Sequence, residues 1–302
     1  RSQIFVIWAK SYSFWHDGRV EHLASKTAVV TGGASGIGLA LGEAFARESM
    51  KVVLADVDEP GLAAAAESLV NAGAEVHTVV CDVSDDGAVE HLRDEALSRF
   101  GAVHVVCNNA GVGGGGPIWE APLETWKWVM GVNFWGVLHG IRAFTPLLIE
   151  QGEGHLVNTA SAAGIVAAPF MGSYCASKHA VVAISEILSA ELHLISSLVR
   201  ASVVCPMWVR TRISESDRNA PAEVLAATKG REDQAGFRDV VTRLIDGGLP
   251  PAVVASAVLS AVKEGRFWVF PHEEVKAQAV ARAERIAREE IPVFEASGLF
   301  QA

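Results

Sequence analysis

The sequence carries the segment Thr31-Gly32-Gly33-Ala34-Ser35-Gly36-Ile37-Gly38 between a short β-branched run and a helical stretch. Glycines at such a junction let the backbone turn sharply and approach a pyrophosphate closely, and the N-terminus of the following helix favours its negative charge. A glycine-rich turn alone has a purely steric explanation as well. Its place between a strand and a helix, with Asp56 lying 20 positions beyond Gly36, predicts a dinucleotide-binding turn.

Asp56 ends the second apolar run of the chain. A carboxylate at this place can accept hydrogen bonds from an adenosine ribose, and it repels a 2′-phosphate. The next residues, Val57, Asp58 and Glu59, supply no arginine that would offset this repulsion. The pattern favours NAD over NADP as the cofactor, whereas the plainer alternative is a solvated aspartate at a strand end.

Apolar and helical stretches alternate over most of the chain. The predicted strands are 27–31, 52–55, 76–81, 103–107, 155–158, 201–205 and 267–270, and the predicted helices between them are 36–48, 60–71, 85–99, 123–149, 173–196 and 252–263. The strands are nearly continuous apolar runs, which is typical of parallel strands covered on both faces. The fold class predicted is therefore α/β, a Rossmann-type doubly wound parallel sheet of seven strands with helices on both faces.

The composition bounds the function classes. The net charge of −10 argues against nucleic acid and anionic membranes as partners, and no apolar stretch approaches the length of a membrane helix. The four cysteines show no C-x-x-C spacing, which favours buried free thiols and a cytoplasmic setting. The histidines show no ligand spacing, so no metal site is expected.

Three parts of the chain are distinguished. Residues 1–24 are expected to be an N-terminal extension outside the fold, residues 25–272 the Rossmann-fold catalytic domain, and residues 273–302 a C-terminal helical tail. Within the domain, residues 212–250 are longer than an ordinary connection and carry many charges, which is typical of a substrate lid.

Tyr174 and Lys178 stand four positions apart in a helical stretch, so they share one helix face. A free tyrosine titrates near 10, and bringing its pKa to about 7 takes about 4 kcal/mol of phenolate stabilisation. One nearby cation supplies a shift of roughly 1 to 3 units, so Lys178 alone is marginal. The positive nicotinamide ring of an oxidised cofactor can supply the rest.

With these motifs the sequence resembles the short-chain dehydrogenase/reductase family over about residues 25–272. The resemblance rests on the glycine turn, on Tyr174 with Lys178, and on Ser161, which lies 13 positions before the tyrosine. It also rests on Asp82-Val83 and Asn108-Asn109-Ala110-Gly111 after the third and fourth strands, and on Asn133.

The resemblance implies a role for each matching residue. Tyr174 would be the general acid/base, Ser161 would hold the substrate oxygen, and Lys178 would lower the tyrosine pKa and bind the nicotinamide ribose. Asn133 would support a water relay to Lys178. The remaining residues implied to contact the cofactor are Asp82, Val83, Asn109, Ala110, Gly111, Pro206, Val209 and Thr211.

One departure from the family pattern concerns the substrate side. The family usually has Pro-Gly after the sixth strand, where the backbone passes the nicotinamide, whereas here Pro206 is followed by Met207, which is expected to narrow the pocket or shift the ring. The resemblance implies a substrate pocket near Trp119, Phe170, Met171, Met207 and Trp208, because these residues fall near positions that line the family's pocket. These side chains suggest an apolar secondary alcohol or ketone, and nothing basic is obviously placed to hold a carboxylate.

Two rival functions remain open from the sequence. One is a non-catalytic dinucleotide-binding sensor on the same fold, and the other is an NADP-dependent carbonyl reductase. The resemblance also implies a homo-oligomer, a tetramer or dimer, built on the long helices that contain Asn133 and Tyr174. Trp126, Trp128, Val129 and Val132 are expected to add apolar surface to the first of these helices.

Overall fold

The computed structural model describes residues 22–230 and 235–292. Its centre is one sheet of seven parallel strands in the order β3-β2-β1-β4-β5-β6-β7. The strands are β1 (Thr27–Thr31), β2 (Lys51–Asp56), β3 (Val76–Val80), β4 (Val105–Asn108), β5 (His155–Thr159), β6 (Arg200–Val204) and β7 (Trp268–Val269). The predicted seven-stranded, doubly wound parallel sheet is confirmed.

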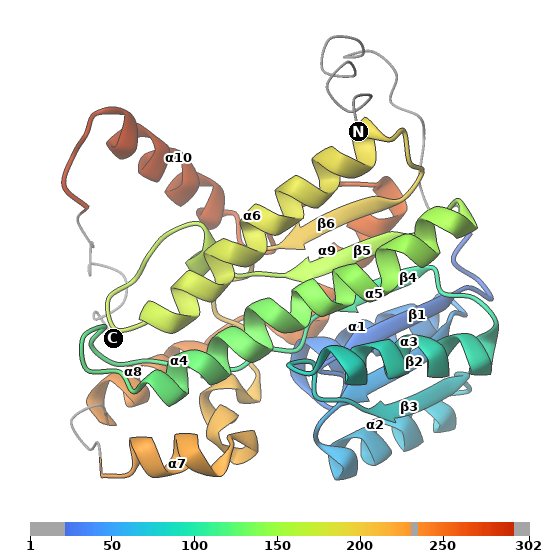
Figure 1. Ribbon diagram of the computed structural model, residues 1–302, viewed down its shortest axis with the longest axis horizontal. Helices are drawn as coiled ribbons and strands as arrows, with labels where there is room; N and C mark the ends of the chain where they lie inside the picture. Colours follow the sequence, from blue (N-terminus) through green and yellow to red (C-terminus); the bar gives the residue numbers. More distant parts are fainter. Residues whose placement is uncertain (1–21, 231–234, 293–302) are drawn as a thin grey trace.

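Helices cover both faces of this sheet. They are α1 (Gly36–Arg47), α2 (Glu59–Asn71), α3 (Asp86–Phe100), α4 (Leu123–Met130), α5 (Gly136–Gln151), α6 (Gly172–Leu194), α7 (Ala222–Thr228), α8 (Ala235–Asp246), α9 (Pro251–Glu264) and α10 (Glu274–Ala287). In Figure 1, α3, α5 and α6 cross in front of the sheet, and α10 stands at the upper left, away from the strands.

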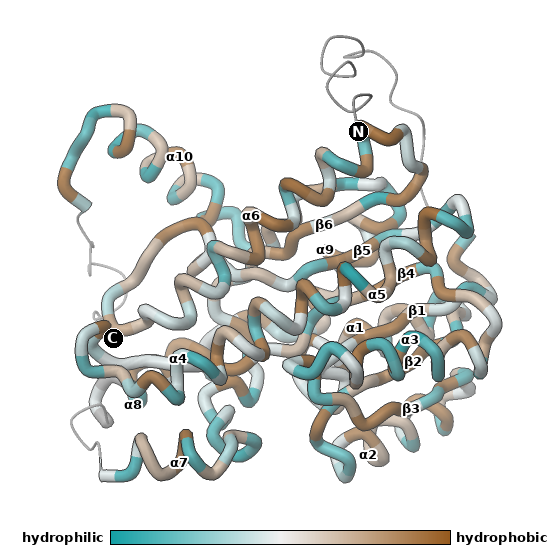
Figure 2. Tube along the Cα trace, viewed as in Figure 1, coloured by the Kyte–Doolittle hydropathy of each residue, from teal (hydrophilic) through white to brown (hydrophobic). Residues whose placement is uncertain are grey.

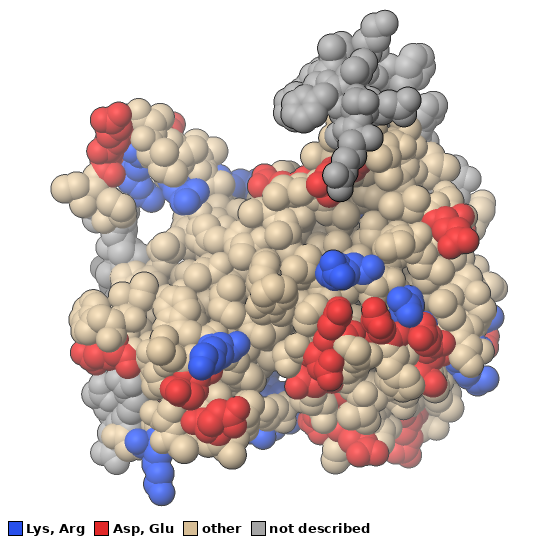
Figure 3. Space-filling view, viewed as in Figure 1, with Lys and Arg blue, Asp and Glu red and all other residues tan. Residues whose placement is uncertain are grey.

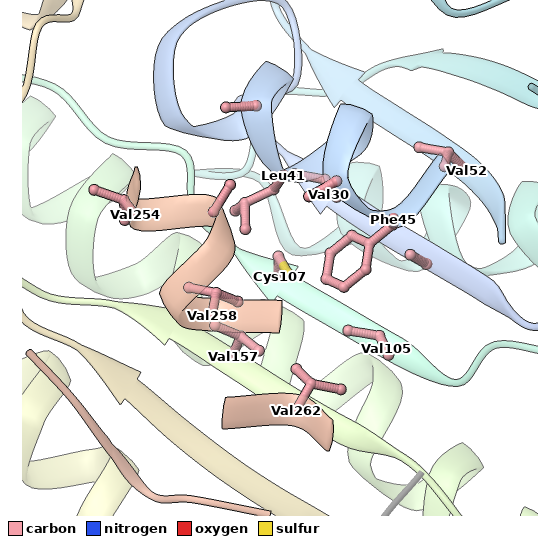
Figure 4. Packing of buried hydrophobic residues seen from close by; sticks show 14 of the residues in the cluster. Val30, Leu41, Phe45, Val52, Val105, Cys107, Val157, Val254, Val258 and Val262 are labelled. Carbon is pink, nitrogen blue, oxygen red and sulfur yellow. The ribbon is translucent and has the colours of Figure 1, made fainter. Parts of the chain in front are cut away.

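Each strand buries both of its faces because successive side chains point to opposite sides of the sheet. In β1, Ala28 and Val30 pack with α1 and α9, whereas Val29 packs with α3 and α5 on the other side. Figure 4 shows the first of these layers, where Phe45 of α1 and Val258 of α9 meet the strands. The apolar segments in Figure 2 follow the strands, while α3 is largely hydrophilic. All four cysteines are buried and free, as predicted.

The helix ends follow local sequence signals. The carboxylates of Asp58 and Asp85 accept hydrogen bonds from Gly61 N–H (3.0 Å) and Gly87 N–H (2.9 Å) and so cap α2 and α3. The helices α3 and α5 end at Gly101 and Gly152, which have φ of 81° and 79°, a left-handed conformation that glycine adopts without strain.

The helix predicted over 123–149 is interrupted in its middle. A π-helical turn, Gly131–Trp135, separates α4 from α5. Such a turn inserts one extra residue into the helix and is frequent at functional sites. Here it carries Asn133, which is fully buried. The apolar periodicity on either side stays helical, so the sequence pattern does not reveal the insertion.

The segment 212–250 is not one long loop. It folds into a 3-10 turn (Arg212–Asn219) followed by α7 and α8, and its base is closed where Leu249 N–H donates to the Trp208 carbonyl (3.0 Å). Its predicted role as a mobile lid stays a prediction, and residues 231–234 lie outside the described residues.

The two ends of the chain are described in part. Of the extension predicted to lie outside the fold, residues 1–21 are outside the described residues, but Leu23 is buried in the core layer of α1 and α9. The predicted C-terminal helical tail contains α10, and residues 293–302 are outside the described residues. Within the described part of the chain, no helix has both the length and the apolar character needed to cross a bilayer.

Candidate functional site

A cleft of about 1070 Å³ opens at the carboxyl ends of the strands. The order of the strands reverses between β1 and β4, and ligands of such sheets bind outside the carboxyl ends at this switch point. The predicted site residues that line the cleft are Gly32, Ser35, Gly36, Ile37, Gly38, Asp56, Asp82, Val83, Asn109, Ala110, Gly111, Ser161, Met171, Tyr174, Lys178, Pro206, Met207, Trp208, Val209 and Thr211.

The turn after β1 has room only for glycine. Gly32 and Gly36 have φ of 69° and 57°, and a Cβ on Gly38 would lie 2.0 Å from the Gly32 carbonyl oxygen. The Ser35 side chain makes no capping hydrogen bond to α1, so the first N–H groups of this helix face the cleft without a side-chain partner. This arrangement fits the pyrophosphate of a dinucleotide.

Asp56 stands at the end of β2 beside this turn. One of its carboxylate oxygens accepts a hydrogen bond from Ala34 N–H and the other from Asp58 N–H, both at 3.1 Å. A carboxylate oxygen has two acceptor positions, so both remain able to accept from ribose hydroxyls. After β3, Asp82 is exposed and Val83 is buried, and both lie at the same end of the cleft as Asp56.

Thr31 joins the ends of β1 and β4. Its hydroxyl accepts hydrogen bonds from Asn109 N–H (2.9 Å) and Ala110 N–H (3.1 Å), which fixes the loop that lines the cleft. The neighbouring Asn108 points elsewhere, because its amide donates to Asn158 Oδ1 (2.9 Å) inside the protein. Asn109 therefore reaches the cleft, whereas Asn108 belongs to the core beneath it.

Asn133 lies one layer behind the cleft and does not line it. Its Oδ1 accepts from Val112 N–H (2.8 Å), and its Nδ2 donates to the Val112 carbonyl (3.0 Å) and to Ser177 Oγ (3.2 Å). The π-helical turn thus holds the backbone after Gly111 in place. Ser177 and Thr31 are polar groups of the site that the sequence reasoning missed.

Ser161, Tyr174 and Lys178 meet at one wall of the cleft. Ser161 follows β5, and the other two lie one turn apart on α6. The Lys178 ammonium donates to the Thr159 carbonyl at the end of β5 (2.9 Å) and lies 5.7 Å from the centroid of the Tyr174 ring. Ser161 makes a side-chain hydrogen bond with Tyr174, and its hydroxyl also lies 3.2 Å from the Pro206 carbonyl.

Burial governs the ionisation of this group. Burial raises the pKa of the Tyr174 phenol to about 12, and the hydrogen bond with Ser161 opposes the rise. Burial also lowers the pKa of Lys178 to about 8, so the ammonium is still charged at neutral pH. The wall therefore places a fixed positive charge beside a phenol that ionises only with further stabilisation.

The segment Pro206–Trp208, where the family pattern has a glycine, is anchored by His272. Met207 N–H donates to His272 Nδ1 (3.2 Å), so the other ring nitrogen carries the proton and donates to the Trp208 carbonyl (3.2 Å). Met207 and Trp208 both line the cleft from this position. No sequence pattern links these residues, because His272 lies 65 positions beyond Met207.

Two predicted pocket residues lie outside the cleft. Trp119 is 79% exposed and its indole N–H donates to Glu120 Oε1 (2.9 Å). Phe170 is 46% exposed and has φ of 65° in the turn before α6. The apolar lining comes instead from Met171, Met207 and Trp208, and from α4, α7 and α8, which supply Trp128, Val224, Val241, Leu244 and Ile245.

Comparison with known proteins supports one family. Residues 26–222 match the model of the short chain dehydrogenase family. The chain is 40% identical over 258 residues to 1-deoxy-11-beta-hydroxypentalenate dehydrogenase of Streptomyces avermitilis, which covers 84% of this chain and 87% of that protein.

Solved structures agree with this result. A short chain dehydrogenase/reductase from Burkholderia phymatum in complex with NAD is 41% identical, with a TM-score of 0.89 over 91% of this chain and 99% of that one. An alcohol dehydrogenase from the archaeon Thermococcus sibiricus complexed with 5-hydroxy-NADP is 27% identical, with a TM-score of 0.67 over 82% of this chain and 95% of that one. The fold, the cleft and these likenesses together show that this chain is an oxidoreductase that belongs to the short-chain dehydrogenase family.

Proposed function

We propose that the protein is an NAD-dependent dehydrogenase that interconverts an apolar secondary alcohol and its ketone, with residues 25–272 as its catalytic unit. The observation that carries this proposal is the meeting of Ser161, Tyr174 and Lys178 on one wall of the cleft whose far end carries the glycine turn. A reacting alcohol and a dinucleotide can therefore occupy the same cavity.

The choice of NAD rests on the adenosine end of the cleft. Asp56 is the charged residue at the end of β2, and its carboxylate would repel a 2′-phosphate at the ribose. The Burkholderia relative is in complex with NAD, which supports the same choice. When bound, the cofactor takes up or gives back the hydride on the alcohol carbon.

The side chains of the protein manage the proton of the alcohol. Ser161 holds the substrate oxygen next to Tyr174, and the Tyr174 phenolate accepts the hydroxyl proton during oxidation. The Lys178 ammonium favours the phenolate, because a cation within a few ångströms stabilises the charged form. Asn133 acts indirectly, since it holds the backbone of Val112, next to Gly111, which faces the Lys178 ammonium.

The apolar lining indicates the substrate class. Met171, Met207 and Trp208 line the cleft near the wall that carries Tyr174, together with apolar side chains of α4, α7 and α8. The Streptomyces relative is named for the dehydrogenation of a hydroxylated compound, which supports oxidation of an alcohol.

The proposal is tested in two steps. The protein is titrated with NADH and with NADPH, and binding is monitored by the fluorescence of the cofactor. NADH should bind more tightly than NADPH. A panel of cyclic secondary alcohols with NAD should then yield NADH and the matching ketones. Tight NADH binding with no turnover across the panel would favour a non-catalytic sensor, and equal use of NADPH would favour the carbonyl reductase.

A further inference from the structure

The substrate end of the cleft is basic, although the chain carries a net charge of −10. Among residues 22–230 and 235–292, four guanidinium groups line this end, and Asp217 is the carboxylate beside them; the four are Arg212, Arg218, Arg238 and Arg285. They come from segments that follow β6 and β7, at the edge of the sheet opposite to β2 and β3, which carry the acidic adenosine end. The sequence reasoning, which found nothing basic at the substrate, missed this feature.

Three of the four arginines already have partners. Arg212 Nε lies 2.8 Å from Glu215 Oε2, and Arg238 Nη1 lies 3.4 Å from Asp217 Oδ2. Arg218 Nη1 donates to the backbone carbonyls of residues 212 and 215, at 2.9 and 3.1 Å. The contacts of Arg212 and Arg218 lie within the turn before α7, and the ion pair of Arg238 joins this turn to α8.

Arg285 differs from the other three. Its side chain is half-buried at the cleft, and within residues 22–230 and 235–292 its guanidinium has no ion pair or hydrogen bond. The nearest acidic neighbour in sequence, Glu284, pairs with Arg288 instead (3.5 Å). A partly desolvated cation with no counter-charge is costly, because it loses hydration without gaining a partner.

Arg285 lies on a face of α10 whose other cleft-lining side chains are uncharged and mostly small. Ala277, Gln278, Ala281 and Arg285 line the cleft, and their spacing places them on one side of the helix. Figure 3 shows basic side chains on the part of α10 nearest the body of the molecule, while acidic side chains gather over α2 and α3. A negatively charged group in the cleft is therefore drawn toward α10 and away from the adenosine end.

We propose that Arg285 binds a carboxylate on the substrate, so that the alcohol or ketone oxidised or reduced here is an apolar hydroxy or keto acid. A carboxylate matches the two parallel N–H groups of a guanidinium and needs one positive charge. A phosphate carries more charge than Arg285 offers, the one arginine without a partner among the described residues that line the cleft. This inference rests on the proposed dehydrogenase function, because it takes the same cleft as the substrate site.

The test is a binding measurement that needs no turnover. The protein loaded with NADH is titrated calorimetrically with adamantane-1-carboxylate and with adamantane-1-carboxamide, which share an apolar skeleton and differ in charge. The acid should bind at least about tenfold more tightly than the amide, because a hydrogen bond to a charged group typically strengthens binding by at least this factor. Arg285→Gln should abolish the preference.

Arg282→Gln is the matched control, because Arg282 lies on the same helix, is exposed and does not line the cleft. It should leave the preference for the acid intact, and both variants should bind NADH like the wild type. Equal binding of acid and amide by the wild type, no binding of either, or a preference that survives Arg285→Gln would overturn the proposal. Weakened NADH binding in Arg285→Gln would assign the arginine to the cofactor phosphates instead.

The two proposals fail in different ways. A preference for the acid that depends on Arg285, together with no alcohol oxidation, would contradict the dehydrogenase function and leave the carboxylate site standing. Alcohol oxidation with equal binding of the acid and the amide would support the dehydrogenase function and contradict the carboxylate site.

Discussion

The Asp56 carboxylate accepts two backbone hydrogen bonds. We propose that its negative charge selects NAD over NADP. Asp56→Ala and Asp56→Asn both remove the charge, and Asn keeps one acceptor for the Ala34 N–H. Both should lower the ratio of kcat/KM with NAD to kcat/KM with NADP by at least about tenfold, because a like charge next to a phosphate is strongly unfavourable. An unchanged ratio in steady-state kinetics of both variants would show that Asp56 does not select the cofactor.

Lys178 is a buried cation, and its burial has a consequence for stability. Its pKa in the folded protein is about 8, below its ordinary value of 10.5, so between these pH values the unfolded chain binds more protons. The free energy of unfolding contributed by Lys178 should therefore rise with pH in this window, by at most about 1.4 kcal/mol per pH unit, and be lowest below pH 8.

Lys178→Met removes this dependence. In urea unfolding across this pH range, the stability of the variant relative to the wild type should be greatest at neutral pH and should shrink as the pH rises toward 10.5. The difference between the two proteins isolates Lys178, since the other titrating groups are common to both. A difference that does not change with pH would mean that the lysine is not desolvated in the folded state.

The short strand β7 is followed by a segment that carries His272, and this segment contacts the substrate end of the cleft. His272 fixes the backbone of Met207 and Trp208 through both ring nitrogens. His272→Ala leaves the Met207 N–H without its partner, so it should lower the free energy of unfolding by about 1–3 kcal/mol. It should also raise the KM for the alcohol more than the Kd for NADH, because Met207 and Trp208 line the substrate end.

The control for this variant is His91→Ala on the exposed side of α3. It should change neither the unfolding free energy nor the KM. If His272→Ala behaved like His91→Ala in both measurements, the anchoring role of His272 would be wrong, and Met207 would be held by its side chain alone.

The elements themselves were largely predictable from the sequence, and the exceptions have physical reasons. Apolar runs mark the strands because both faces of the sheet are covered, so six of the seven begin within one residue of the predicted start. The π-helical turn at Asn133 was not predictable, since an inserted residue leaves the surrounding helical pattern intact. The helices of 212–250 were missed because their apolar residues face a cleft that the sequence does not display.

Site residues that lie close together in the sequence could be predicted, whereas those that only folding brings together could not. The glycine turn and the Tyr174–Lys178 pair each lie within a few consecutive residues, and their spacing reveals them. Trp119 and Phe170 were expected in the pocket because they fall near positions that line the family's pocket, but the turns that carry them direct them to the surface. Arg285 and His272 reach the site from the end of the chain, which only the folded arrangement shows.

At the scale of the whole molecule, α5 and α6 leave apolar side chains exposed on one side of the sheet. Three of the residues expected to provide this surface do not, because Val129 is buried and Trp128 and Val132 line the cleft. The exposed groups are instead Trp135, next to α5, and Ile187 on α6, which are 48% and 55% exposed. Together with the resemblance stated above, they support a homo-oligomer that buries this face.

Light scattering at micromolar concentration should therefore show a dimer or a tetramer. Ile187→Arg should shift the protein toward the monomer, because it places a charge in the proposed interface. Val70→Arg on α2, at a residue that is 54% exposed and away from α5 and α6, should not. A wild-type monomer, or equal effects of the two substitutions, would contradict this assembly.

We propose that this chain moves a proton through Tyr174 in the same cleft that is proposed to bind NAD. The most direct test compares alcohol oxidation and NADH binding in the wild type and in Tyr174→Phe, which removes only the hydroxyl. NADH affinity and the unfolding transition should stay unchanged, while turnover should fall by at least about 10²- to 10⁴-fold, the usual worth of general acid/base catalysis. Turnover above about a tenth of the wild-type value, with NADH still bound, would contradict the account.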